Sequence, residues 1–175
     1  MINFCPDCSH PVEHAIPQGE DRIRAICNSC ETVHYQNPRV ITGTIPVWKG
    51  KVLLCRRNIQ PRIGLWTLPA GFLELNETSE EGAIRETWEE SQAKVNVHRL
   101  HGVYNIPRVN QIYMLYLAEL TTPKFAPTPE SSEVQLFSTE EFPWDQLAFK
   151  VVEQSLKNFL LDSSPEGQLF HSTIA

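Results

Sequence analysis

The sequence predicts an α/β fold in which helices flank a mixed β-sheet and a small metal-binding segment comes first. Three observations carry this prediction. After Pro38, strand-like and helical patterns mix without strict βαβ alternation. Before Pro38, four of the five cysteines form two close pairs. The chain has 175 residues, 41% hydrophobic and 21% charged, which is typical of a globular protein with one core and a small appendage. We therefore expect two domains, residues 1–38 and residues 39–175.

The larger domain is expected to begin with a β-hairpin followed by a helix. Residues 40–48 are rich in β-branched side chains, and the apolar residues 51–56 follow a two-residue Lys-Gly turn. Thr78 and Glu81 have the spacing of a capping box, in which each residue satisfies a backbone N–H of the other. A helix is therefore predicted to begin there and to run to about Ser91.

The second half of the chain continues the mixed pattern. Strands are expected over 94–104 and 111–120, and the second of these is strongly apolar. Residues 121–132 contain three prolines, which indicates a loop. A short strand over 134–137 and helical spacing over 151–160 complete the elements. The result is a mixed sheet with helices packed on it.

The paired cysteines predict a structural zinc site. Cys5 and Cys8 are separated by two residues, as are Cys27 and Cys30, and eighteen residues lie between the pairs. Two such pairs can supply the four thiolates of a closed tetrahedral site, and the bound metal would contribute folding free energy to a segment without a core. A chance pattern of reduced cysteines and a redox pair are the alternatives. Cys55 lies in an apolar strand and is expected to be a small buried side chain.

Other polar residues of the first segment are not expected to bind metal or nucleic acid. Three histidines fit solvated loop positions, because four thiolates already complete a zinc site: His10, His14 and His34. Residues 1–38 carry two basic and five acidic side chains. A nucleic-acid-binding segment normally has an excess of basic residues, so a structural role is favoured.

Three glutamates gather on one side of the predicted helix. At about 100° per residue, Glu86, Glu89 and Glu90 fall within one arc. The residues on the facing arc are expected to be buried: Ala83, Ile84, Thr87 and Trp88. Like charges at this spacing repel each other, and hard divalent cations such as Mg²⁺ prefer clustered carboxylate oxygens. The sequence therefore predicts a divalent-metal site, with a solvated acidic face as the alternative.

The residues flanking the glutamates support the metal site. Gly71 allows a tight loop to bring its carbonyl oxygens beside the start of the helix. Arg85 lies at the edge of the acidic arc and can pair with Glu77, which would lock the loop onto the helix.

The segment from Gly71 to Ala93 resembles the Nudix box, G-x5-E-x7-R-E-U-x-E-E-x-G-U, in which U is aliphatic. Its defining positions are filled by Gly71, Glu77, Arg85, Glu86, Glu89 and Glu90. Two positions depart from the pattern: Thr87 stands at an aliphatic position, and Gln92 replaces the last glycine. The preceding residues 66–71 resemble the W-x-L-P-G-G lead-in of the same family.

The whole chain resembles zinc-ribbon Nudix hydrolases, particularly the FAD/ADP-ribose pyrophosphatase type. Three further segments support this narrower match: residues 35–38, 54–61 and 129–133. The resemblance implies an α/β/α sandwich with a mixed sheet. It also implies hydrolysis of the diphosphate linkage in a nucleoside diphosphate derivative, either FAD, giving FMN and AMP, or ADP-ribose. NADH or NAD pyrophosphatase is the alternative, disfavoured because the S-Q-P-W-P-F-P-x-S stretch of the NADH enzymes is missing. A non-catalytic nucleotide-binding module is a further alternative.

The resemblance also assigns roles to individual residues. Glu86, Glu89 and Glu90, with the Ala70 carbonyl, would bind Mg²⁺ or Mn²⁺, and Glu77 would pair with Arg85. The general base is a box glutamate or a later loop glutamate. Two loop candidates lie in the proline-bearing region: Glu133, and with less support Glu130. We count Glu133 with the three box glutamates as the candidate catalytic residues.

The sequence indicates the residues that contact the substrate less clearly than it indicates the metal ligands. Five aromatic residues near strand ends or loops could stack on a base: Tyr35, Trp48, Tyr104, Tyr113 and Phe125. Three arginines could contact phosphate: Arg56, Arg57 and Arg108. Each of these is more often a core, rim or solvated side chain.

The net charge and the hydropathy limit which partners and which cellular location we expect. The formal net charge is −6, so a nucleic-acid partner is not expected and bound cations must attract a phosphate substrate. No apolar run approaches the roughly 18 residues of a membrane helix. The expected partners are a small-molecule nucleotide and, from the family resemblance, a second copy of the chain in a homodimer. The expected location is the cytoplasm.

Overall fold

The computed structural model describes residues 2–162 and 167–175. The chain divides into two compact units, residues 1–37 and residues 38–175. The first unit contains a three-stranded antiparallel sheet in the order β1 (Glu13–Ala15), β2 (Arg24–Ile26) and β3 (Val33–His34). These short strands join the two cysteine-bearing turns, and the cysteine pattern alone did not predict them.

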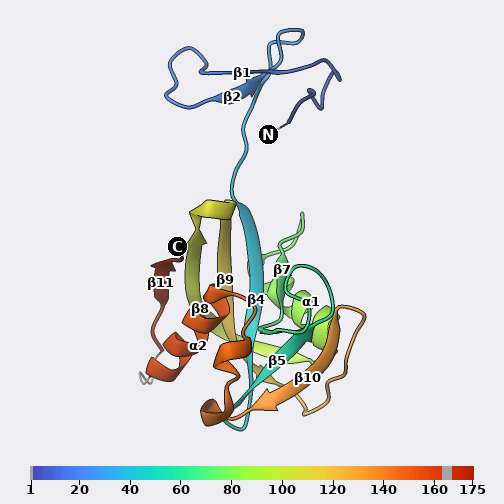
Figure 1. Cartoon of the computed structure of the whole chain (residues 1–175), viewed down its shortest axis with the longest axis vertical. Coiled ribbons are helices and arrows are strands. Elements are labelled where there is room, and N and C mark those ends of the chain that lie inside the picture. The colour runs from blue at the N-terminus through green and yellow to red at the C-terminus, as the bar shows by residue number, and fades with distance from the viewer. Residues whose placement is uncertain (1, 163–166) are drawn as a thin grey trace. The chain divides into compact units, whose positions relative to one another are not determined.

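The second unit is built on an eight-stranded mixed sheet (Figure 1). Its main path runs β10-β5-β4-β9-β8-β11, while β6 pairs with β5 and β7 with β4. The strands are β4 (Arg39–Trp48), β5 (Lys51–Arg57), β6 (Trp66–Thr67), β7 (Ala70–Phe72), β8 (Val95–Ile106), β9 (Gln111–Leu120), β10 (Ser131–Phe137) and β11 (Phe170–Thr173). The helices are α1 (Ser79–Ser91) and α2 (Lys150–Leu161), with three 3₁₀ turns at Pro107–Val109, Thr139–Glu141 and Trp144–Gln146. The predicted mixed sheet and both helices are therefore present, and β11 was not predicted.

The two helices cover opposite faces of the sheet (Figure 1). Successive side chains of β5 point to opposite faces, which separates Val52 and Leu54 from Leu53 and Cys55. Val52 and Leu54 belong to the larger core cluster, which contains α2 residues such as Leu156. Leu53 and the fully buried Cys55 belong to the smaller cluster on the α1 side, as expected for a small buried cysteine. The result is the α/β/α arrangement that the sequence predicts.

The sheet splits between the neighbouring strands β4 and β5, and the candidate site lies at this split. β4 and β5 pair only next to their turn, at Val47 with Val52 and at Trp48 with Lys51. Farther along, β6 continues on β5 and β7 continues on β4. The chain therefore crosses from one side of the split to the other just before Ala70. None of the helices in the described part of the chain is long and apolar enough to cross a membrane.

Candidate active site

Helix α1 begins as its sequence predicts. Thr78 is the N-cap, its side chain accepts from the Glu81 N–H, and the Glu81 carboxylate accepts from the Thr78 N–H at 2.8 Å. The helix ends at Gln92, which takes the left-handed conformation with φ 54°. Glycine is the residue that best tolerates this conformation, so Gln92 gives the helix end at a small conformational cost where the Nudix box usually has glycine.

The buried face of α1 differs from the predicted one. Ala83 and Thr87 are buried as expected, but Ile84 and Trp88 are 37% and 46% exposed, so that part of the prediction is wrong. Glu90 is only 6% exposed instead. The reason is the helical geometry: at about 100° per residue Glu90 lies close to Ala83 and Thr87 on the buried face, whereas Trp88 lies on another side of the helix.

Hydroxyl groups connect α1 to the sheet. Thr87 donates to the Ala83 carbonyl at 2.7 Å, and its oxygen lies 2.6 Å from the Thr44 hydroxyl of β4. Near the start of α1, the Ser79 hydroxyl lies 2.6 Å from the Tyr116 hydroxyl of β9. Both contacts are partly or fully buried. Thr87 stands at a box position that is usually aliphatic, and the hydroxyl of Thr44 on the neighbouring strand β4 forms a hydrogen bond with it.

Arg85 joins the loop before α1 to three carboxylates. Its Nε and Nη2 donate to Glu77 at 3.0 and 2.7 Å, and its Nη1 donates to Glu86 at 2.7 Å and to Glu89 at 3.0 Å. Nη2 also donates to the Phe72 carbonyl at 3.0 Å. The Arg85 guanidinium lowers the pKa of Glu77 to about 2. The loop is thus held against the helix by one guanidinium, in the arrangement expected from the sequence.

Gly71 lets the loop lie directly on the Glu86 carboxylate. A Cβ atom at this position would lie 2.3 to 2.4 Å from the Glu86 carboxylate atoms, so any other residue here would displace that carboxylate. The Thr44 N–H donates to the Pro69 carbonyl and the Leu73 N–H to the Val40 carbonyl. Because strand carbonyls alternate in direction, the Ala70 carbonyl points away from β4, on the edge where the Phe72 carbonyl meets Arg85. This orientation leaves the Ala70 oxygen facing the split.

Burial and mutual repulsion raise the pKa of two box glutamates. The pKa of Glu90 is raised to about 8, first by burial and next by the neighbouring Glu86 carboxylate, whereas Arg57 and the Ala70 N–H lower it. The pKa of Glu86 is also raised, mainly by burial, although Arg85 opposes this. Glu130 also raises both pKa values, as a smaller contribution. Two buried acids with raised pKa values mark a place where a cation would be favoured.

The two loop glutamates lie in different surroundings. Glu133, on β10, accepts from Arg56 Nη1 at 2.8 Å. Glu130 is held near the end of β5, because its carbonyl accepts from the Asn58 N–H at 2.8 Å. Glu130 is among the groups that raise the pKa values of Glu86 and Glu90, after burial and nearer charges. The loop candidate with less support in the sequence is therefore the one whose charge is felt at these glutamates.

The metal-free protein should lose stability as the pH rises through the range in which Glu90 titrates. Glu90 binds its proton more tightly when folded, with a pKa of about 8 against an ordinary 4.5, so the folded state holds more protons between these values. The free energy of unfolding should fall by on the order of 4 kcal/mol from pH 5 to pH 8 in a chelator-treated sample. Glu90→Gln should remove most of this slope in urea unfolding. An equal slope in both proteins would contradict the assignment.

The oxygen donors at the split suit a hard divalent cation. Glu86 and Glu90 come from one helix, Ala70 supplies a carbonyl, and Glu89 is more exposed with Arg85 beside it. Carboxylate and carbonyl oxygens are the donors that Mg²⁺ and Mn²⁺ prefer. Among the described residues these carboxylates are not gathered into a metal-sized cluster, because Arg85 holds those of Glu86 and Glu89.

The four paired cysteines come together in the first unit. Their Sγ atoms all lie within 4.8 Å of one another. Cys5 and Cys30 are 3.7 Å apart, Cys8 and Cys27 3.4 Å, and Cys8 and Cys30 3.5 Å. A tetrahedral zinc ion with bonds of about 2.3 Å requires sulfurs about 3.8 Å apart. The sulfur spacing therefore fits a four-thiolate metal site.

The aromatic residues predicted as candidates for base stacking lie in different parts of the structure. Tyr104 is fully buried, and both Trp48 and Phe125 pack against the smaller core cluster. Tyr35 belongs to the first unit and donates to Glu20 at 2.5 Å. Tyr113 lies near the candidate site: burial raises its pKa, and the charges of Arg57 and Glu90 also act on that pKa.

Phe72 is an aromatic residue that the sequence analysis overlooked. It follows Gly71 directly, its side chain is 46% exposed, and the Arg39 guanidinium lies 5.0 Å from the ring centroid. By strand alternation it shares a sheet face with Ala70. An exposed aromatic residue adjoining the box glycine would have been the signal for it.

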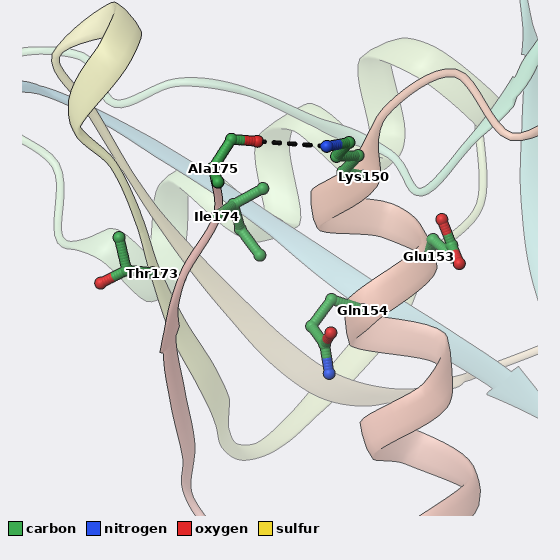
Figure 2. A pocket seen from close by; sticks show the side chains of 6 residues that line it. All are labelled: Lys150, Glu153, Gln154, Thr173, Ile174 and Ala175. Atoms are coloured by element: carbon green, nitrogen blue, oxygen red, sulfur yellow. Dashed lines mark hydrogen bonds between the residues drawn. The ribbon is translucent and has the colours of Figure 1, made fainter.

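A shallow hollow of about 240 Å³ lies between α2 and the C-terminal residues (Figure 2). Its lining consists of Lys150, Glu153, Gln154, Thr173, Ile174 and Ala175, and Lys150 Nζ lies 3.4 Å from the Ala175 carbonyl oxygen. None of the residues predicted for the active site lines this hollow.

Comparisons with known proteins agree with this architecture. The NUDIX domain model matches residues 37–159, and the model of the Nudix N-terminal zinc ribbon matches residues 3–36. The NAD-capped RNA hydrolase NudC of Vibrio parahaemolyticus is 29% identical over 167 residues, covering 92% of this chain and 62% of that protein. The ADP-ribose pyrophosphatase of Methanocaldococcus jannaschii is 30% identical over 130 residues, covering 72% of this chain and 75% of that protein.

Solved structures show the same fold. A NUDIX hydrolase from Nitrosomonas europaea superimposes with a TM-score of 0.93 at 45% identity, covering 99% of this chain and 100% of that one. An ADP-ribose pyrophosphatase from Streptococcus suis superimposes with a TM-score of 0.64 at 23% identity, covering 77% of this chain and 99% of that one. The chain spans about three fifths of the length of the NudC proteins that it matches.

Proposed function

This chain belongs to the Nudix family, and we propose that it is a divalent-metal-dependent pyrophosphatase that cleaves the diphosphate linkage of a nucleoside diphosphate derivative. The observation that carries the proposal is the burial of Glu90, 6% exposed, on the helix that also carries Glu86, whose carboxylate helps to raise the pKa of Glu90. A solvated acidic face would not bury Glu90. A bound cation accounts for that burial.

The proposed metal ligands are Glu86, Glu89 and Glu90 with the Ala70 carbonyl, and the proposed ions are Mg²⁺ or Mn²⁺. Such ions neutralise a diphosphate and acidify water. Arg85 and Glu77 would keep the loop on the helix and would not touch substrate. Zn²⁺ is proposed for the four cysteines, with a structural role.

Glu130 is our proposed general base for the attacking water. It acts on the same two glutamates that would hold the metal, whereas Glu133 is paired with Arg56. A carboxylate that is not occupied by an ion pair is available to accept a proton. Glu133 stays a candidate from the sequence, and its pairing supports a role in positioning β10 against β5 instead.

ADP-ribose is the substrate that the relatives support best, because the Methanocaldococcus jannaschii relative is named for this activity and is well covered. NAD is the second candidate, favoured by the several NudC relatives. Those relatives are named for NAD-capped RNA, so the expectation of no nucleic-acid partner loses support. FAD rests only on the sequence resemblance. The homodimer and the cytoplasmic location stay predictions.

A substrate panel tests the proposal. The full-length protein would be incubated with Mg²⁺ or Mn²⁺ and with ADP-ribose, NAD, NADH or FAD, and the products separated by chromatography. We expect metal-dependent release of AMP, and of ribose 5-phosphate from ADP-ribose. Tight nucleotide binding without turnover of any of the four would favour the non-catalytic module.

Arg57 is expected to contribute to phosphate binding, whereas its neighbour Arg56 is not. Arg57 donates to the carbonyls of Pro61 and Gln60 at 2.8 and 3.5 Å, and no carboxylate in the described residues pairs with it. Arg56 is already paired with Glu133. Arg57→Ala should lower kcat/KM about 10- to 100-fold, because hydrogen bonds to charged groups contribute about 1.5 to 3 kcal/mol. Arg56→Ala is the matched control, and equal losses in the two variants would contradict this assignment.

Phe72 is expected to stack on the base of the nucleotide. Phe72→Leu should weaken binding of the product AMP about tenfold, because base–aromatic stacking contributes about 1 to 3 kcal/mol. Trp88→Leu is the control, since Trp88 is also 46% exposed and also lies beneath a cation, Lys94, at 5.8 Å. Calorimetry with AMP and with ribose 5-phosphate separates base contacts from phosphate contacts. A loss of affinity for ribose 5-phosphate in Phe72→Leu would argue against stacking.

A further inference from the structure

His34 lies against one sulfur of the four-cysteine cluster. Its Nε2 atom is 3.3 Å from Cys5 Sγ, although the sequence suggested a solvated loop histidine. A thiolate bound to a metal carries lone pairs and no proton, so in the metal-bound protein the ring nitrogen has to be the donor. This contact is additional to the four sulfurs and is not explained by a four-thiolate site alone.

The surroundings of Cys5 make such a donor necessary. Cys5 is 1% exposed, so water cannot solvate its thiolate. Four thiolates around Zn²⁺ carry a formal charge of minus two, in a segment with more acidic than basic residues. Both arginines of that segment are already paired, Arg24 with Glu20 and Arg22 with Asp21. A neutral imidazole N–H is therefore the group that can stabilise this buried sulfur.

The sheet of the first unit fixes the position of His34. Strand β3 pairs with β2 so that His34 lies opposite Ala25, and β2 leads directly to Cys27. Cys30 has a comparable donor, because its sulfur lies 3.2 Å from the Thr32 hydroxyl. Residues of the turn and of β3 thus approach sulfurs from both cysteine pairs.

We propose that His34 donates a hydrogen bond from Nε2 to the Cys5 thiolate and so holds that sulfur in place for the structural metal ion. His34 is then a positioning residue and not a fifth ligand. Outer partners of this kind typically change metal affinity 10- to 100-fold when they are removed. The inference rests on the zinc assignment and is independent of the proposed pyrophosphatase activity.

His14 provides a matched control in the same sheet. It is also a histidine, and it also lies opposite Ala25, but on the other neighbouring strand, β1. Its side chain is exposed. Among the described residues it belongs neither to the four-cysteine group nor to the second group of possible metal ligands, Cys5, Asp7 and His34. Loss of His14 removes an imidazole from the same ladder without touching a sulfur.

The test is zinc release from the full-length protein to a chromogenic chelator, measured for the wild type, His34→Ala, His34→Gln and His14→Ala. We expect zinc affinity to fall 10- to 100-fold in His34→Ala, to recover in part in His34→Gln, whose amide can donate, and to stay unchanged in His14→Ala. X-ray absorption should report four sulfurs in the wild type and in His34→Ala.

Three results would overturn the proposal. Equal zinc affinities in His34→Ala and His14→Ala would remove the role of the hydrogen bond. A nitrogen in the zinc shell of the wild type would make His34 a ligand. A wild-type protein that binds no zinc would remove the site itself, whatever its activity on nucleotides.

Discussion

Glu90→Gln is expected to lower Mg²⁺-dependent hydrolysis by at least about a hundredfold while the fold stays intact. Removing an outer partner of a metal ligand already costs about 10- to 100-fold, so removing a proposed ligand should cost more. Glutamine has the same shape, and in the metal-free protein it replaces a side chain whose pKa is already raised to about 8. The readout is kcat and KM for the best substrate of the panel, with circular dichroism as the check on folding.

Glu80→Gln is the control for that variant. Glu80 lies in the first turn of the same helix and is exposed, away from the cluster. It should keep wild-type activity. If Glu90→Gln also keeps it, or if both variants lose the same activity, Glu90 does not hold the catalytic ion.

Removing zinc is expected to unfold the first unit. Residues 1–37 hold only short strands and few buried apolar side chains, and structural zinc contributes roughly 10 to 16 kcal/mol of apparent binding free energy in small domains. Cys27→Ser should therefore abolish the hydrogen-exchange protection of the β2 amides, Arg24 to Ile26. Cys27 is chosen because its side chain is fully buried.

Cys55→Ser provides the comparison for Cys27→Ser. Cys55 is also buried, but it lies in the other unit and is not among the four clustered sulfurs. It should leave the zinc content and the protection of β2 unchanged. Protected β2 amides in chelator-treated wild-type protein would show that the unit folds without metal.

The sequence predicted those parts of the fold that depend on local signals. The capping box of Thr78 and Glu81 located the start of α1, and the apolar pattern over 151–160 located α2. The spacing of the glutamates pointed to α1 as the helix of the candidate site, which stays a prediction. The two cysteine pairs marked the sulfur cluster. In each case, a few neighbouring residues suffice to specify the geometry.

The remaining features depend on contacts between distant segments. The backbone carbonyl of Glu90 accepts from Cys55 of β5 and from Thr128 in the loop after Phe125, so segments distant in the sequence pack against this turn of α1. Thr87 is accommodated because Thr44 lies opposite. Strand β11 contains only four residues, and its amino-acid composition does not indicate that it pairs in parallel with β8. Helical periodicity could predict neither the contact between Thr87 and Thr44 nor strand β11.

Anomalous diffraction from crystals grown with Mn²⁺ tests the central claim most directly, namely that the buried glutamates of α1 are stable because a cation lies among them. We predict manganese peaks within bonding distance of Glu86 and Glu90 and beside the Ala70 carbonyl, and their loss in Glu90→Gln crystals. Saturating Mn²⁺ with no peak at these carboxylates, or a peak that survives in Glu90→Gln, would contradict the account.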